Sequence, residues 1–147
     1  SPHNLRLREN IGVVVAERCS GLLIEKDKTT QLSFNTDKEL AEGFYNNAKS
    51  KGIRVVAVNY GTDQGPFSCM PLDWGTLIPM YFLRKLNNIV LITPSRELPW
   101  TELFEFGRCI AEVSEPQKRI AIIASADQAH AHRSDGPYGY DEAAVIR

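Results

Sequence analysis

Histidine is rare in this chain, and two of its three histidines lie close together beside a carboxylate. Asp127, His130 and His132 fall in the run SADQAHAH, which follows an apolar segment. In an extended backbone, His130 and His132 would share one face and could bind one metal ion. In a helical turn, Asp127 and His130 would be neighbours, an arrangement that suits acid–base chemistry near neutral pH. The alternative is that both histidines only cap a strand end or hydrogen-bond a loop.

Three other short motifs carry residue types that could build or line a site. His3 stands in SPHN, where the pattern alone favours a surface histidine near a terminus. Trp74 follows Asp73 in LDWG, at the entry to an apolar run where an aspartate favours helix capping. Pro137 and Tyr138 belong to GPYGY, whose turns and aromatic rings suit the wall of a pocket for a flat substrate but are also common in ordinary loops.

Hydrophobic periodicity predicts the elements that must position these residues. Thr36 and Glu39 form a capping-box pattern for a first helix that Gly52 would end, and Pro79 would start or kink a second, buried helix. Continuous apolar runs predict strands that are covered on both faces. The predicted strands cover residues 11–16, 21–25, 29–34, 53–60, 87–95 and 119–125, and the predicted helices cover residues 36–52, 76–86 and 99–115.

The order of these elements predicts a single α/β domain over residues 1–147. The first three strands resemble a small meander, and helices then alternate with buried strands. We therefore expect a central mixed, mostly parallel sheet with helices on both faces. Ligands of such sheets bind at the carboxyl ends of strands, so SADQAHAH, NYGTDQG and TPS are expected at one functional rim. The Gly/Pro-rich residues 61–75 have the length of a functional loop.

Composition and missing motifs exclude several classes of function. With 17 basic against 18 acidic residues, nucleic acid and anionic membranes are poor candidates as partners. No apolar run is as long as a membrane span, and three distant cysteines favour a reducing, cytoplasmic location. The sequence has no serine-hydrolase elbow, phosphate loop, dinucleotide fingerprint or HExxH motif. It starts without Met and ends without a polar tail, so we expect a piece of a longer protein.

Taken together and in this order, SPHN, PLDWGTLIPMYFL and SADQAHAH followed by GPYGY resemble the class III extradiol ring-cleavage dioxygenases of the LigB-like superfamily. The resemblance implies an α/β fold and a mononuclear Fe(II) held by two histidines and one glutamate. It implies that His3 is a metal ligand and that His130 is the acid/base residue over the substrate. Asp127 would orient His130, and His132 would be a neighbour rather than a ligand. The implied substrates are a catechol-like aromatic diol and O₂.

The same resemblance implies that the other two ligands lie outside this chain. The first metal histidine would precede SPHN, and the glutamate would lie well beyond His130, so that Glu142 follows too closely to be that ligand. We therefore expect N- and C-terminal portions to be missing and iron binding by these residues alone to be weak or absent. We also expect a homo-oligomer.

Where many relatives have a histidine in a D-H-G motif, this chain has Trp74. That difference favours a second hypothesis, a non-catalytic LigB-like or Memo-like protein-interaction module. A third hypothesis is a metal-dependent hydrolase that uses Asp127, His130 and His132 together.

Overall fold

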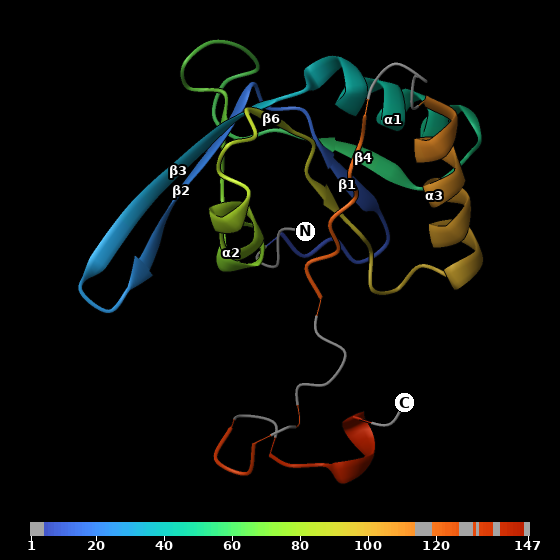
Figure 1. Cartoon of the computed structure of the whole chain (residues 1–147). Helices are drawn as coiled ribbons and strands as arrows, with labels where there is room; N and C mark the ends of the chain where they lie inside the picture. The colour runs from blue at the N-terminus through green and yellow to red at the C-terminus, as the bar shows by residue number, and fades with distance from the viewer. Residues whose placement is uncertain (1–4, 114–118, 127–130, 132, 137–138, 146–147) are drawn as a thin grey trace.

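The computed structural model describes residues 5–113, 119–126, 131, 133–136 and 139–145. Seven strands and three α-helices occupy this part of the chain, followed by a short 3₁₀ helix (Figure 1). The strands are β1 (Ile11–Val14), β2 (Arg18–Glu25), β3 (Lys28–Thr36), β4 (Val55–Val58), β5 (Cys69–Pro71), β6 (Asn88–Ile89) and β7 (Ile92–Thr93). The helices are α1 (Lys38–Ser50), α2 (Trp74–Phe82), α3 (Trp100–Val113) and η1 (Glu142–Val145).

β1 is the central strand of a three-stranded sheet with the order β4-β1-β7. It pairs in parallel with β4 and antiparallel with β7. All four residues of β1 are buried, because Ile11 and Val13 face a core formed with α1 and α3 while Val14 belongs to a second core. The prediction that the first three strands form one meander is therefore wrong for β1, whose partners lie much later in the chain.

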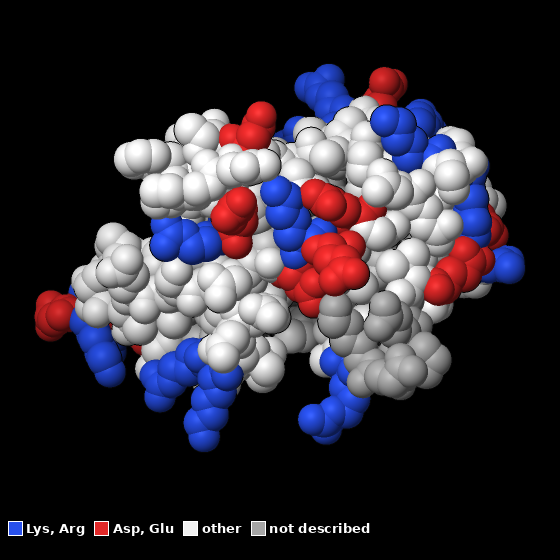
Figure 2. All heavy atoms as spheres, turned by 90° about the horizontal axis from the view of Figure 1, so that it is seen from above, with Lys and Arg blue, Asp and Glu red and all other residues white. Residues whose placement is uncertain are grey.

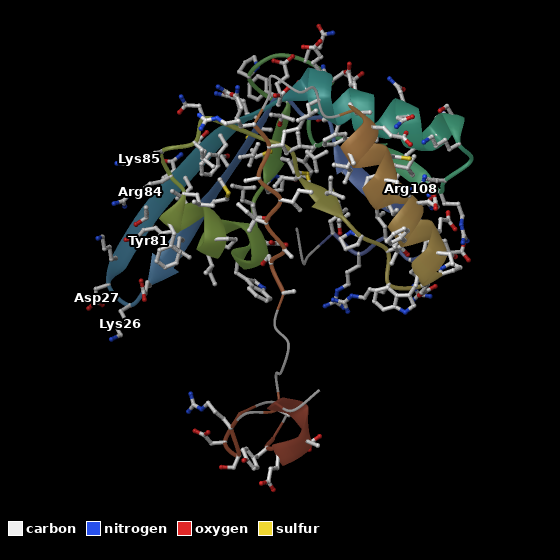
Figure 3. The ribbon with its side chains drawn as sticks, turned by 45° about the vertical axis from the view of Figure 1, so that its right-hand side comes forward. Lys26, Asp27, Tyr81, Arg84, Lys85 and Arg108 are labelled. Atoms are coloured by element: carbon white, nitrogen blue, oxygen red, sulfur yellow. The ribbon has the colours of Figure 1, made fainter. Side chains whose placement is uncertain are left out.

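β2 and β3 form a long hairpin inside a second, four-stranded sheet with the order β5-β2-β3-β6. The hairpin itself agrees with the sequence prediction. Its turn is two residues long, and Lys26 takes a positive φ of 51° there. Figure 3 shows Lys26 and Asp27 at the far end of the hairpin, which projects past α2.

α1 and α3 pack side by side over one face of the β4-β1-β7 sheet (Figure 1). α1 begins after Asp37, whose carboxylate accepts a hydrogen bond from the Leu40 amide at 3.2 Å. The predicted cap at Thr36 is one residue early, because Thr36 is still the last residue of β3. The predicted stop is confirmed: α1 ends at Ser50, and Gly52 follows with a φ of +75°.

α2 lies against the hairpin and closes the second core rather than being buried all round. Leu77 and Met80 pack with residues from β2, β3 and β5, but Ile78 and Phe82 on the other side are exposed. The prediction of a fully buried helix is therefore wrong for this outer side. The helix runs through Pro79 and begins at Trp74 rather than at Thr76, with Asp73 at the N-cap position.

Three predicted strands differ from the structure. Residues 53–60 contribute only β4, an edge strand whose Ala57 is exposed. Residues 87–95 cross from one sheet to the other, because β6 pairs with β3 while β7 pairs with β1. Residues 119–126 form no hydrogen-bonded strand, and most of them are exposed.

The α/β class is confirmed, with sheets that mix parallel and antiparallel pairs and two cores in which helices cover opposite sides of β1. Cys19, Cys69 and Cys109 are all free thiols, as expected. None of the helices in the described part of the chain combines the length and the apolar composition needed to cross a membrane. In the view from above, acidic and basic side chains lie interspersed, which agrees with the near-neutral composition (Figure 2).

Candidate functional site

Most of the residues predicted to do chemistry lie outside the described part of the chain. This applies to His3, Asp127, His130, His132, Pro137 and Tyr138. Their assignments stay predictions, and only Trp74 among the predicted site residues can be placed directly. The described segments that follow SPHN and LDWG can be placed relative to each other.

Buried hydroxyl groups at the end of β7 hold the segment that follows SPHN. The Thr93 hydroxyl donates a hydrogen bond to the Leu5 carbonyl at 3.1 Å, and the Ser95 hydroxyl donates to the Arg8 carbonyl. Both hydroxyl-bearing residues are buried. Since a buried polar group is costly without a partner, these bonds fix the path of the chain just after His3.

Close packing around Gly12 tightens the same region. A Cβ atom at Gly12 would lie 2.7 Å from both a Leu7 methyl carbon and the Thr93 methyl carbon. A larger residue would therefore force the Leu7 and Thr93 side chains to move. Glycine at this position leaves room for both side chains next to β1.

The same N-terminal segment also reaches the core under α2. Leu5 packs against the cluster that contains Leu77 and Met80 of α2 together with Leu91. The residues after SPHN, the helix after LDWG and the end of β7 thus share one region of the molecule.

The start of α2 presents one aromatic ring and one buried hydroxyl group. Trp74 is the first residue of the helix, and its side chain is 53% exposed. Asp73 has extended backbone angles at the N-cap position, but its side chain makes no capping hydrogen bond to the helix. The Thr76 hydroxyl is buried and has no hydrogen-bond partner among the described residues. The predicted position of Asp73 as the cap residue is confirmed, but its predicted capping bond is not formed.

The predicted functional rim does not form as one edge. β4 runs parallel to β1, so NYGTDQG follows the carboxyl end of that pair. β7 runs antiparallel to β1, which brings TPS to the amino end of β1, beside Leu5 and Arg8. The prediction that NYGTDQG and TPS meet is therefore wrong, because it assumed that β7 was parallel to its neighbour.

The loop after β4 is held mainly by its own hydrogen bonds. Asn59 accepts from the Tyr60 amide at 2.7 Å and donates to the Thr62 carbonyl at 2.9 Å, while the Ser68 hydroxyl donates to Asn59 at 3.2 Å. Arg18 reaches the Pro66 carbonyl at 2.7 Å. Part of this predicted functional loop is β5, which pairs with β2. These contacts give the loop a clear structural role.

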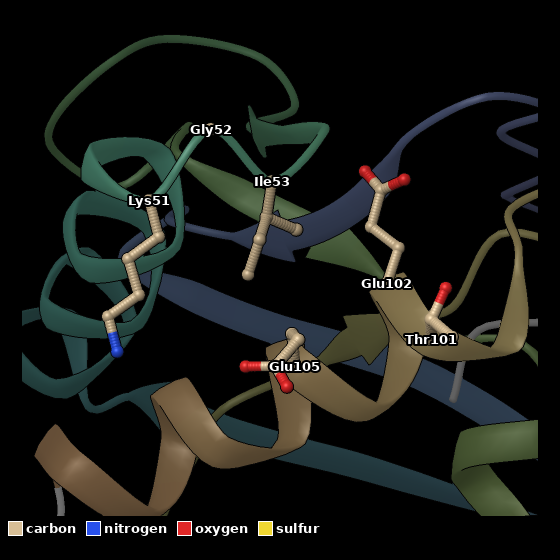
Figure 4. Close-up of a pocket in the computed structure, with 6 residues that line it drawn as sticks. All are labelled: Lys51, Gly52, Ile53, Thr101, Glu102 and Glu105. Atoms are coloured by element: carbon tan, nitrogen blue, oxygen red, sulfur yellow. The ribbon is translucent and has the colours of Figure 1, made fainter.

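A cavity of about 280 Å³ lies between the end of α1 and the start of α3 (Figure 4). Its charged residues are already engaged in ion pairs. Glu102 accepts hydrogen bonds from the Arg54 guanidinium and from the Arg54 amide, both at 2.8 Å, and these bonds lower the pKa of its carboxyl group. Lys51 pairs with Glu112. None of the predicted motif residues lines this cavity, which is bordered by Lys51, Gly52, Ile53, Thr101, Glu102 and Glu105.

The described residues offer no ready metal centre. No group of three or more His, Cys, Asp or Glu side chains among them could hold a metal ion. Burial raises the pKa of the Cys19 thiol to about 11, so this cysteine stays protonated at neutral pH and is a poor ligand or nucleophile. Burial also raises the pKa of Cys109.

Sequence reasoning missed the anchoring role of Thr93 and Ser95. The available signal was two hydroxyl residues at the end of an apolar run, where buried polar side chains need partners. The partners are the backbone carbonyl groups of Leu5 and Arg8. Every residue has a carbonyl group, so the side-chain sequence could not predict which ones would accept these bonds.

Comparison with known proteins matches most of the chain to one family. A family model described as "Catalytic LigB subunit of aromatic ring-opening dioxygenase" matches residues 14–146. Protein CA_C1420 of Clostridium acetobutylicum is 29% identical over 148 residues, which cover 97% of this chain and 31% of that protein. The chain thus spans about a third of the length of this curated relative.

Proposed function

Because this chain belongs to the LigB family of catalytic subunits of aromatic ring-opening dioxygenases, we propose that the protein opens the ring of a catechol-like diol with O₂ in the extradiol manner. The observation that carries the proposal is the family match over residues 14–146. Thr93 and Ser95 hold the segment after SPHN, and Leu5 joins that segment to the core under α2. The residues that follow SPHN and the core residues of α2 thereby lie in one region.

Fe(II) is the metal that the family chemistry implies, and it would supply coordination positions for the diol and O₂. The described residues do not fit a complete metal site. His3 is the ligand that we assign to this chain. We expect the remaining ligands to come from polypeptide outside residues 1–147.

The chain's own residues have separate proposed roles. His130 would move a proton to and from the reacting oxygen atoms, since an imidazole titrates near neutral pH. Asp127 would accept a hydrogen bond from that ring and hold its orientation. Trp74, Pro137 and Tyr138 would flank the flat face of the substrate, and the exposure of Trp74 leaves its ring accessible. We propose a cytoplasmic homo-oligomer that binds neither nucleic acid nor membrane.

The test uses the protein expressed from its complete gene, loaded anaerobically with Fe(II) and supplied with catechol-type diols. We expect O₂ uptake and a yellow ring-fission product. His130→Gln should lower kcat by about 10²- to 10⁴-fold with iron retained, because only proton transfer is lost. His132→Gln is the matched control and should remain near wild type. Failure to bind iron stoichiometrically, together with absence of product, would rule out the enzymatic proposal.

A non-catalytic interaction module remains the second candidate, and Trp74 in place of the family's histidine favours it. The metal-dependent hydrolase is the third. Metal analysis of His3→Ala separates the enzymatic candidates, because the dioxygenase should lose its iron whereas a site built from Asp127, His130 and His132 should retain metal. A protein that binds no metal and turns over no diol would favour the interaction module.

A further inference from the structure

Residues 119–126 expose an apolar, β-branched run. Ile120, Ile122 and Ile123 are 36%, 79% and 43% exposed, and these residues form no hydrogen-bonded strand. In an extended chain, successive side chains point to opposite faces, so Ile122 and Ile123 would leave both faces of a strand uncovered. Isolated exposed apolar residues are ordinary, but a continuous uncovered run of this kind indicates a missing partner.

The fold already places this run where another strand would belong. β7 is the last strand in the order β4-β1-β7. Figures 1 and 3 both show the orange trace of residues 119–126 passing beside β7 and running in the same general direction. α3 lies between the two segments in the sequence and packs over the sheet. A strand, a covering helix and a parallel neighbouring strand form the usual crossover unit.

The sequence of the run is that of an interior strand. Natural edge strands are protected from unwanted pairing by charged residues, proline or bulges. From Ile120 to Ala126 this chain has no charged residue and no proline. A strand of a parallel sheet that is buried on both faces shows this continuous apolar pattern.

We propose that residues 119–125 are an interior strand of the β4-β1-β7 sheet and that their open edge is covered by a β-strand from polypeptide of the same protein outside residues 1–147. The relative supports this source, since more than half of its length lies outside the matched region. The covering strand adds backbone hydrogen bonds along the edge and apolar side chains over Ile122 and Ile123. The inference goes beyond the proposed function and does not depend on catalysis.

Hydrogen exchange on the protein expressed from its complete gene tests this proposal directly. The amides of residues 119–125 should exchange at least about 100-fold more slowly than in an unstructured peptide of the same sequence. The amides of β1 serve as an internal reference for buried strands. Exchange at the rate of the free peptide would overturn the proposal.

The open edge could instead be covered by a second copy of the chain. Diluting the protein distinguishes a covering strand from the same molecule from one that a second copy supplies. Protection supplied by the same protein should persist when size-exclusion chromatography with light scattering shows a monomer. Protection that disappears together with a dimer would assign the edge to a second copy and overturn the proposal.

A pair of matched variants gives a second readout. Ile122→Asp in the complete protein should lower Tm by about 10 °C or more, because it buries a charge in the completed sheet. Ile24→Asp changes an exposed isoleucine on the β2–β3 hairpin and should leave Tm nearly unchanged. If Ile122→Asp is too unstable to purify while Ile24→Asp is obtained normally, that contrast also supports burial of Ile122. Equal small effects at both positions would contradict it.

Discussion

Two short apolar segments of this molecule have similar residues and opposite surroundings. The β1 segment Ile11–Val14 reads IGVV and is buried at every position. Residues 120–123 read IAII, and all four are exposed. β1 has a strand on each side and a core on each face, whereas the later segment lies beside β7 and forms no hydrogen-bonded pair. Apolar composition alone therefore does not determine whether a segment is buried. Burial also depends on whether neighbouring strands and core residues are present to cover it.

The clearest way to sharpen this contrast is to make the same substitution in both segments. Ile11→Ala should lower the free energy of unfolding by about 2–5 kcal/mol, because it leaves a cavity in the α1/α3 core. Ile122→Ala in the 147-residue chain should change it by less than about 0.5 kcal/mol, as expected for an exposed side chain. Urea titration of both variants measures the difference. Equal losses would show that the later segment is covered within these residues.

A smaller effect is expected from weakening the helix that covers β1. Asp37→Ala removes the carboxylate that accepts the Leu40 amide at the start of α1, so the free energy of unfolding should fall by about 1 kcal/mol. Hydrogen exchange should quicken in the first turn of α1. Asp37→Asn keeps an acceptor oxygen and serves as the control, which should remain close to wild type. A loss as large in Asp37→Asn would assign the effect to charge rather than to capping.

The smallest effect concerns the ion pair that joins α3 to the start of β4. Arg54 lowers the pKa of the Glu102 carboxyl group, so the folded state gains stability from this pair above the unfolded-state pKa. That gain is lost as the pH falls through the lowered folded-state pKa. Glu102→Gln should therefore lower Tm by about 2 °C at pH 7, and the difference should shrink in acid.

Glu105→Gln provides the comparison for this pH dependence, because Glu105 pairs within α3 with Arg108 rather than across elements. Its effect on Tm at pH 7 should be the smaller of the two. A Tm difference for Glu102→Gln that stayed constant down to pH 2 would contradict an origin in the carboxylate charge.

Local patterns predicted the local structure well. The two strands of the hairpin, the end of α1 and the existence of α3 all follow from periodicity and from Gly52. Several of the failures concern partner choice. Residues 87–95 form a uniform apolar run, yet β6 and β7 within it join different sheets. No residue in the run marks the change, since strand direction and partner depend on the chain path on either side.

The candidate site also combines features that local patterns predict with features that depend on the path of the chain. The motifs could be read from residue types, and Trp74 begins α2 close to where its motif predicted a helix. The position of the segment after SPHN could not be read in this way. It depends on hydrogen bonds from Thr93 and Ser95 to backbone carbonyl groups nearly 90 residues earlier, and carbonyl groups are the same in every residue type.

The central position of β1 also has a consequence for synthesis. This strand is made early, but it pairs with β4 and β7, which follow tens of residues later. As the nascent chain leaves the ribosome, α1 and β4 can cover part of β1, but Ile11, Val13 and Val14 lack their full set of contacts until β7 and α3 have been translated. We expect folding during translation to be delayed to that point, with β1 as the segment that a chaperone would engage first.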